Sequence, residues 1–181
     1  MILSDRELVE MLREPRTRRE GFAVLVKQYS EKLYWKVRRI VLSHEDANDV
    51  LQNVFIKVWS NLQNFQGNSS LSTWLYRIAI NESLDFLRKQ KLADKVSADE
   101  DVSVASRLMS DEYFDGDEVQ ARLQEAVARL PEVQRTVFNL KYFEEMKYSE
   151  ISQILNTSEG ALKASYHLAV KKITEYLHLF D

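Results

Sequence analysis

The stretch YSEISQILNTSEGALKASYHLAVKKI, residues 148–173, decides how the second half of this chain folds. Its first part places apolar side chains at helical spacing, and Asn156 stands where a left-handed residue commonly ends a helix. Ser158 is well placed to cap a second helix, whose apolar residues again recur with a helical period. The stretch therefore predicts a short helix, a turn of about three residues and a longer helix, which together form a helix-turn-helix.

The predicted second helix has a polar face beside its apolar stripe. In a helix-turn-helix the second helix commonly lies in the major groove of DNA. The free N–H groups at the helix start suit a phosphate, and a glycine there lets the backbone approach closely. The face has no arginine, so this module alone should bind DNA weakly. A helical hairpin that only supports the fold is the competing interpretation. The candidate contacts with duplex DNA are Ser158, Gly160, Lys163, His167 and Lys171.

Glycine and proline are rare in the whole chain, with four and two residues among 181. Long helices are therefore expected, and sheets with tight turns are not. Apolar residues at helical spacing predict helices over residues 4–12, 18–41, 72–91 and 118–129. Ser43 is expected to cap a further helix, with Asp46 completing a capping box. Another helix is expected to have Pro131 at its first position. The last of these helices is expected to bury Val133, Val137 and Leu140 along one face. The sequence predicts an all-α protein.

The charge of −3 is unevenly distributed along the chain. Residues 1–92 carry 15 Lys and Arg against 11 Asp and Glu, residues 93–118 carry 2 against 9, and residues 119–181 carry 8 against 8. The middle segment is acidic, rich in Asp and Ser, and without a sustained period, as linkers are. We therefore predict two small helical domains, 1–92 and 119–181, joined by an acidic linker over 93–118, the C-terminal domain being the helix-turn-helix.

The composition excludes several classes of protein. The chain has no cysteine, so it has no disulfide, thiol nucleophile or thiolate metal site. Its three histidines lack ligand spacing along one helix face. No apolar run approaches the ~20 residues of a membrane span, and the N-terminus does not have the pattern of an export signal. We expect a soluble, intracellular protein with no metal, no cofactor and no membrane insertion. A helical hydrolase has almost no support, because no nucleophile–base pair is visible.

Taken together, three segments resemble a known family. They are DANDVLQNVFIKVW (46–59), FQGNSSLSTWLYRIAINESLDFLRK (65–89) and LPEVQRTVFNLKYFEEMKYSEISQIL (130–155). In this order and spacing the chain resembles the bacterial RNA polymerase sigma factors of the extracytoplasmic-function (ECF) group, from about residue 3 to residue 177. The resemblance implies a cytoplasmic, non-enzymatic factor that binds core RNA polymerase and directs promoter recognition, DNA melting and initiation. A stand-alone helix-turn-helix regulator that acts without polymerase is the alternative.

For the first of these segments the resemblance implies docking on the clamp helices of the polymerase β′ subunit. A carboxylate and two amides around an exposed isoleucine suit an interface containing arginine. The family usually has a second acid where this chain has Asn53, so one charge-assisted contact is missing. A solvated polar face is the alternative interpretation. The candidate polymerase contacts are Asp49, Gln52, Asn53 and Ile56. The flap of the β subunit is the further polymerase partner implied.

For the second segment the resemblance implies reading of the −10 promoter element and capture of an unstacked base. A base is held outside a duplex only by a pocket that replaces its stacking and pairing. The loop supplies amides and hydroxyls, and the following helix supplies a wall that includes Tyr76. For Trp74, a position in the core is the alternative. The candidate contacts with the single strand are Gln66, Gly67, Asn68, Ser69, Trp74, Arg77, Asn81 and Arg88.

The resemblance also assigns the −35 element, in duplex form, to the helix-turn-helix. The acidic linker is implied to pass through polymerase channels, where its charge could mimic RNA. Sigma factors of this group commonly pair with an anti-sigma factor that covers both DNA-reading domains, so such an inhibitor is a candidate partner beside core polymerase and promoter DNA.

Overall fold

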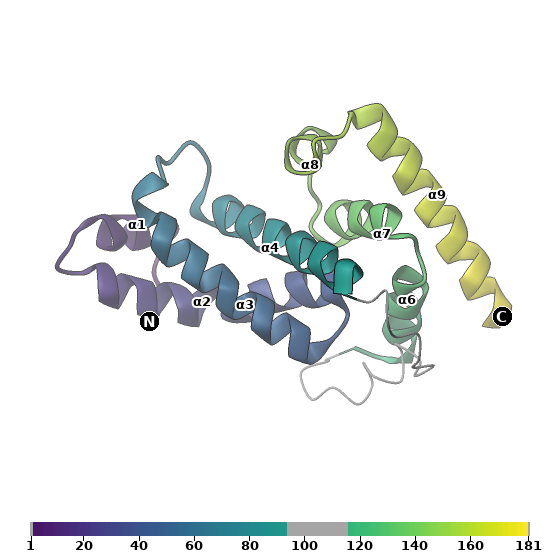
Figure 1. Cartoon of the computed structure of the whole chain (residues 1–181), viewed down its shortest axis with the longest axis horizontal. Helices are drawn as coiled ribbons and strands as arrows, with labels where there is room; N and C mark the ends of the chain where they lie inside the picture. Colours follow the sequence, from purple (N-terminus) through teal and green to yellow (C-terminus); the bar gives the residue numbers. More distant parts are fainter. Residues whose placement is uncertain (1, 94–115, 181) are drawn as a thin grey trace. The chain divides into compact units, whose positions relative to one another are not determined.

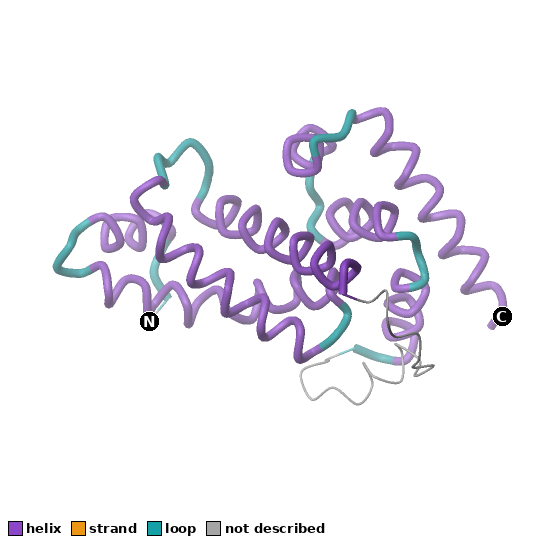
Figure 2. The backbone as a smooth tube through the Cα atoms, viewed as in Figure 1, coloured by secondary structure: helices purple, strands orange, loops and turns teal. Residues whose placement is uncertain are grey.

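The computed structural model of the chain describes residues 2–93 and 116–180. The chain divides into two compact units, Met1–Lys95 and Val96–Asp181. Within the described residues both units consist of helices and connecting turns, without a strand (Figures 1 and 2). The predicted all-α class is therefore confirmed. Residues 94–115, which make up most of the predicted acidic linker, lie outside the described residues, and the predicted domain limits stay a prediction.

The first unit is built around a long central helix. α2 packs against α1, α3 and α4, and α3 also packs against α4. The side chains between them are fully buried aliphatic residues such as Leu25, Leu33, Val54 and Leu75. The elements are α1 (Asp5–Arg13), α2 (Arg18–Val41), α3 (His44–Asn61), the 3-10 turn η1 (Leu62–Asn64) and α4 (Leu71–Ala93).

Two helices of the first unit, α1 and α3, begin at the predicted cap residues. Ser4 and Glu7 form a reciprocal capping box at the start of α1. The Ser43 hydroxyl accepts from the Asp46 N–H at the start of α3, at 3.3 Å. The return bond from the Ser43 N–H to Asp46 does not form, so this part of the predicted capping box is wrong. The aspartate side chain is one methylene shorter than the glutamate that usually completes such a box.

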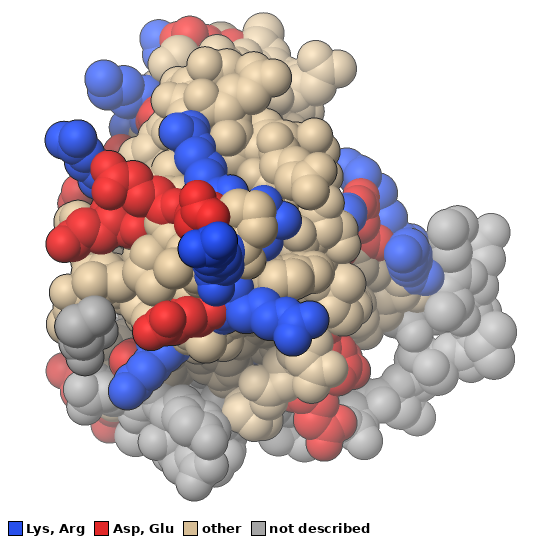
Figure 3. Space-filling view, turned by 90° about the vertical axis from the view of Figure 1, so that its left-hand side faces the viewer, with Lys and Arg blue, Asp and Glu red and all other residues tan. Residues whose placement is uncertain are grey.

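α1 lies very close to α2 where Gly21 faces Met11. A Cβ placed on Gly21 would lie 2.8 Å from the Met11 Cβ, so only glycine fits without a shift of the helices. Arg18 adds a polar tie, because its Nε donates to the carbonyl oxygen of Leu12 at 3.0 Å. The α1–α2 turn is thereby fixed on the body of the unit. Figure 3 shows the molecule from this end of the unit. Basic side chains (blue) gather near the centre of the view, with acidic side chains (red) beside them.

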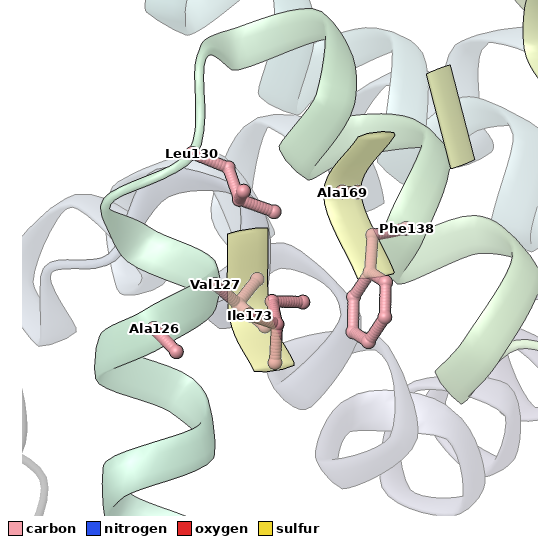
Figure 4. Close-up of a cluster of buried hydrophobic side chains, with 6 residues drawn as sticks. All are labelled: Ala126, Val127, Leu130, Phe138, Ala169 and Ile173. Atoms are coloured by element: carbon pink, nitrogen blue, oxygen red, sulfur yellow. The ribbon is translucent and has the colours of Figure 1, made fainter. Parts of the chain in front are cut away.

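The second unit packs its helices around α9. The cluster in Figure 4 joins side chains of α6, α7 and α9 with one from the turn after α6: Ala126, Val127, Leu130, Phe138, Ala169 and Ile173. Arg135 donates from Nη1 to the carbonyl oxygen of Ala128 at 3.2 Å and so ties α7 to α6. The elements are α6 (Glu118–Ala128), α7 (Glu132–Phe138), the π-helical turn η2 (Asn139–Phe143), α8 (Tyr148–Leu155), α9 (Glu159–Leu177) and the 3-10 turn η3 (His178–Phe180).

Two expectations about α7 are wrong. Pro131 is the N-cap, with an extended ψ of 145°, and the helix begins one residue later at Glu132. Val133 does not join Val137 and Leu140 in the core, because its exposed fraction is 61%. It lies in the first turn of α7, whereas the buried residues of this segment begin at Thr136, in the second turn. The helical period was therefore correct, but the first turn extends beyond the packed part of the helix.

Candidate polymerase and nucleic-acid interfaces

The outer face of α3 carries all four predicted polymerase contacts. Asp49, Gln52 and Asn53 are exposed, and Ile56 has an exposed fraction of 63%. This follows from the opposite face, where Val50, Val54 and Val58 are buried against the rest of the unit. A large exposed aliphatic side chain ringed by a carboxylate and amides is a composition suited to a protein interface.

Sequence reasoning missed Trp59, which extends this face by one turn beyond Ile56. Its exposed fraction is 42%, and its ring packs edge-on to Phe22 of α2 with centroids 5.0 Å apart. The spacing of three residues from Ile56 was the available signal. A tryptophan that is held on one side and exposed on the other is typical of interface anchors.

An ion pair joins α3 to α4 next to both candidate faces. Lys57 follows Ile56 in α3, and its Nζ pairs with the carboxylate of Glu82, which follows Asn81 in α4. The Glu82 side chain is largely buried, with 15% exposed, so this contact is shielded from water more than most surface pairs are. The pair therefore helps to hold the two helices in one fixed register.

The loop over residues 65–70 contains a backbone turn that only glycine adopts easily. Gly67 has a φ of +76°, in the left-handed region. Ser70 then caps α4, because its hydroxyl accepts from the Thr73 N–H at 3.1 Å. The predicted contacts Gln66, Gly67 and Asn68 are exposed, and Ser69 is half-buried. The cap function of Ser70 was not predicted from the sequence.

Trp74 stands at the base of this loop. It is half-buried, and its ring lies 5.1 Å from that of Phe65 at an interplanar angle of 48°. It is therefore neither a fully buried core residue nor a free platform. The Tyr76 ring, expected as part of the pocket wall, faces α2 instead, where the Lys36 Nζ lies 4.0 Å from its centroid. Burial and the nearby Asp5 raise the pKa of Tyr76.

The helix after the loop carries the three remaining predicted contacts. Arg77 is half-buried, and its buried Nε has no hydrogen-bond partner within the described part of the chain. Asn81 is exposed one turn further on. Arg88 is exposed but pairs with Asp85 at 2.8 Å, a contact that sequence reasoning did not anticipate. An exposed pair of this kind contributes little, ~0–1 kcal/mol, so a phosphate can replace the carboxylate.

In the second unit the helix-turn-helix forms as predicted. Asn156 ends α8 in the left-handed conformation, with φ of 51° and ψ of 47°. Ser158 caps α9, its hydroxyl accepting from the Ala161 N–H at 3.3 Å. The buried side chains Ile151 and Leu162 hold α8 and α9 together.

All five predicted contacts of the helix-turn-helix are exposed. A Cβ on Gly160 would meet no atom within 4 Å, so the glycine is not required by packing. The Lys163 Nζ lies 5.7 Å from the centroid of the Tyr148 ring on α8. Lys171 lies 4.0 Å from Glu175, at the limit of an ion pair, and His167 is exposed between the two lysines. The Ser158 hydroxyl accepts in its cap bond, which leaves its own O–H able to donate.

Two further properties bear on the kind of site. Across residues 2–93 and 116–180, no helix combines the length and apolar character needed to cross a membrane. In the same residues, no group of three or more His, Cys, Asp or Glu side chains is placed to hold a metal ion.

Comparison with known proteins gives matches over both units. A family model described as Sigma-70 region 2 matches residues 25–93, and one described as Sigma-70, region 4 matches residues 120–173. The ECF RNA polymerase sigma factor SigW of Bacillus subtilis is 34% identical over 82% of this chain and 84% of its own length. The RNA polymerase sigma-H factor of Pseudomonas aeruginosa is 31% identical over 96% of this chain and 93% of its own.

Solved structures share the fold. The sigma factor RpoE of Bartonella quintana, solved with the anti-sigma factor NepR, aligns with a TM-score of 0.70 and 20% identity over 88% of this chain and 98% of its own. CnrH, solved with the cytosolic domain of CnrY, aligns with a TM-score of 0.67 and 21% identity over 98% of this chain and 99% of its own.

Proposed function

This chain belongs to the extracytoplasmic-function sigma factors of bacterial RNA polymerase, and from that premise we propose how its surfaces divide the work of initiation. As a sigma factor it binds core polymerase, recognises promoter DNA and directs initiation. Such factors are in general non-catalytic, and we assign no reaction to this chain itself. The observation that carries the proposal is that the predicted polymerase and duplex-DNA contacts are exposed on α3 and α9, whose opposite faces are buried. The predicted single-strand contacts lie in the loop over residues 65–70 and along α4, which follows it.

The outer face of α3 is the proposed polymerase contact, on the clamp helices of the β′ subunit. Ile56 supplies an apolar centre, and Trp59 enlarges it beyond the set predicted from sequence. Asp49 supplies the charge for a guanidinium of the partner, a contact that is strong when bidentate. The second unit is proposed to rest on the flap of the β subunit.

The loop over residues 65–70 and the first turns of α4 are the proposed single-strand site for the −10 element. The left-handed Gly67 turns the loop, so that exposed amides of Gln66 and Asn68 can reach the edge of a base. Arg77 and Asn81 stand on the adjoining face of α4. Stacking and edge contacts contribute ~1–3 kcal/mol per base, comparable to the energy of unstacking one, so the site can capture separated strands without ATP.

The exposed face of α9 is the proposed contact with the −35 element in duplex form. With Lys163, Lys171 and His167 as its basic groups, the face neutralises few phosphates, and its affinity alone is low. Two weak modules tied to one enzyme gain affinity through effective concentration. We propose that the protein acts in the cytoplasm, and that an anti-sigma factor regulates it, as NepR is solved in complex with Bartonella RpoE.

The variant Asp49→Arg tests the polymerase contact. Because Asp49 is exposed, its replacement should leave the fold intact while placing a like charge against the partner's arginine. We expect the variant not to co-elute with core polymerase in analytical gel filtration. Its melting temperature should equal that of the wild type. Glu31→Arg, an equal charge change at an exposed site on α2, is the matched control and should bind as the wild type does. If Asp49→Arg binds core polymerase normally, the proposal that α3 contacts the polymerase is wrong.

A further inference from the structure

The turn between α1 and α2 is rich in arginine. Residues 13–19, here called the basic turn, hold four arginines and one glutamate. Arg18 serves the fold, because it donates to the carbonyl oxygens of Leu12 and Arg13. Arg13, Arg16 and Arg19 are exposed, and within the described residues none of the three forms an ion pair. Three guanidinium groups are therefore available to a partner.

One residue of the basic turn, Arg13, extends its side chain toward the loop proposed to hold the unstacked base. The Arg13 Nη2 is 3.5 Å from the position that a Cβ on Gly67 would take. The two residues are far apart in sequence, and it is the packing of α1 on η1 and α4 that brings them together. The Arg13 guanidinium therefore lies close to the exposed loop where its backbone is left-handed. A strand whose base enters the loop must run past this group.

We infer that Arg13, Arg16 and Arg19 contact phosphates of the single DNA strand next to the captured base, with Arg13 nearest to the loop. This inference rests on the proposed single-strand site. Guanidinium groups bind phosphate oxygens through paired, charge-assisted hydrogen bonds. The basic turn contains only polar and charged residues besides Pro15, so it lacks the apolar centre of a protein interface. Nucleic-acid backbone is the partner that such a surface fits.

The salt dependence of DNA binding tests this inference, because it counts phosphate contacts. Each contact with single-stranded DNA contributes about 0.7 to the slope of log K against log salt, so three contribute about 2. The probe is a promoter fragment from a start site mapped with the wild-type holoenzyme, its −10 region left unpaired. We expect the holoenzyme carrying Arg13→Gln, Arg16→Gln and Arg19→Gln to bind it with a slope smaller by about 2. Over a threefold rise in salt, the wild type should then lose about tenfold more affinity than the variant.

The control variant Arg6→Gln, Lys27→Gln, Lys32→Gln removes the same charge from exposed sites of α1 and α2 and should keep the wild-type slope. If the basic-turn variant has the wild-type salt slope, this inference is overturned. If Asn81→Ala still weakens DNA binding in that case, the proposed single-strand site is retained. If Asn81→Ala and Asn68→Ala also bind normally, the proposed single-strand site fails as well. Loss of core polymerase binding without DNA would make the basic turn a protein contact, and would also overturn the inference.

Discussion

Gly21 and Gly160 are both helical glycines, but a Cβ would meet opposite surroundings at the two positions. At Gly21 it would lie 2.8 Å from the Met11 Cβ on the neighbouring helix. At Gly160 nothing lies within 4 Å. The first glycine is thus required by packing, whereas the second leaves the start of α9 open to a phosphate.

We predict that Gly21→Ala lowers the free energy of unfolding. Overpacking of this kind destabilises by ~1–3 kcal/mol, more than the roughly 1 kcal/mol that alanine adds to a helix interior. Urea unfolding followed by circular dichroism measures the change. Gly160→Ala is the matched control, and it should be at least as stable as the wild type. A Gly21→Ala protein more stable than the wild type would contradict the close packing of α1 on α2.

Lys36 makes the stability of the first unit depend on pH. Burial, with Arg39 and Lys32 close by, lowers the pKa of Lys36 to about 8. From about pH 8 to pH 10 the unfolded chain holds more protons at this side chain than the folded chain does, because an ordinary lysine titrates near 10.4. Stability should therefore rise with pH across this window. Above it, the raised pKa values of Tyr29 and Tyr76 act in the opposite direction.

We expect Lys36→Met to flatten the rise of the melting temperature between about pH 8 and pH 10. Differential scanning calorimetry at several pH values measures it. Lys27→Met, at an exposed position of α2, should keep the wild-type dependence. An unchanged rise in Lys36→Met would mean that another group is responsible.

At the scale of elements, the first turns of α4 contain both residues that stabilise the fold and residues of the proposed single-strand site. Ser70 caps the helix, Leu71 and Leu75 are buried in the core, and Trp74 supports the loop between them. The same few residues therefore anchor the proposed single-strand site and present it. Loss of the cap should therefore lower both the stability of the fold and the affinity for the single strand.

Ser70→Ala should destabilise the protein by ~1 kcal/mol, because the Thr73 N–H loses its acceptor. The first turn of α4 should then fray, and binding of the unpaired −10 strand by the holoenzyme should weaken. Thermal unfolding measures the first effect and fluorescence anisotropy the second. Ser69→Ala, which removes a hydroxyl with only a 3.4 Å contact to the Ser70 carbonyl oxygen, should leave stability unchanged. Equal stability of the two variants would argue against the cap.

Local chemistry explains what could be predicted from sequence. The caps at Ser4 and Ser158 and the left-handed Asn156 follow from short-range rules, and the exposed face of α3 follows once its apolar stripe is buried. The proximity of the Arg13 guanidinium to Gly67 could not be predicted, because no local sequence pattern relates these two residues. The exposure of Val133 depends on where the packing of α7 begins.

The whole molecule combines two units, and we propose a weak DNA surface on each of them. In residues 1–92 basic side chains are in excess, with 15 Lys and Arg against 11 Asp and Glu, whereas residues 119–181 are balanced at 8 against 8. Neither unit has the strongly basic surface that high non-specific affinity requires. A tether and the polymerase are therefore needed to add the two contributions to promoter affinity.

Cutting the tether should separate these contributions. We predict that a protease site placed in the acidic segment 93–118, cleaved after the holoenzyme has formed, lowers promoter affinity by ~10²–10⁴-fold, because the second contact is no longer intramolecular. Competition gel-shift measures the loss. The uncleaved protein with the same insertion is the control. Full affinity after cleavage would show that the polymerase alone holds both units in place.

The most direct test of the central claim is equilibrium binding of a labelled promoter fragment to this chain, with and without core polymerase. We predict sequence-specific binding only when chain and core enzyme are both present, and weak, salt-sensitive, unspecific binding by the chain alone. Tight selection of the same fragment by the free chain would contradict the account and favour a regulator that acts without polymerase.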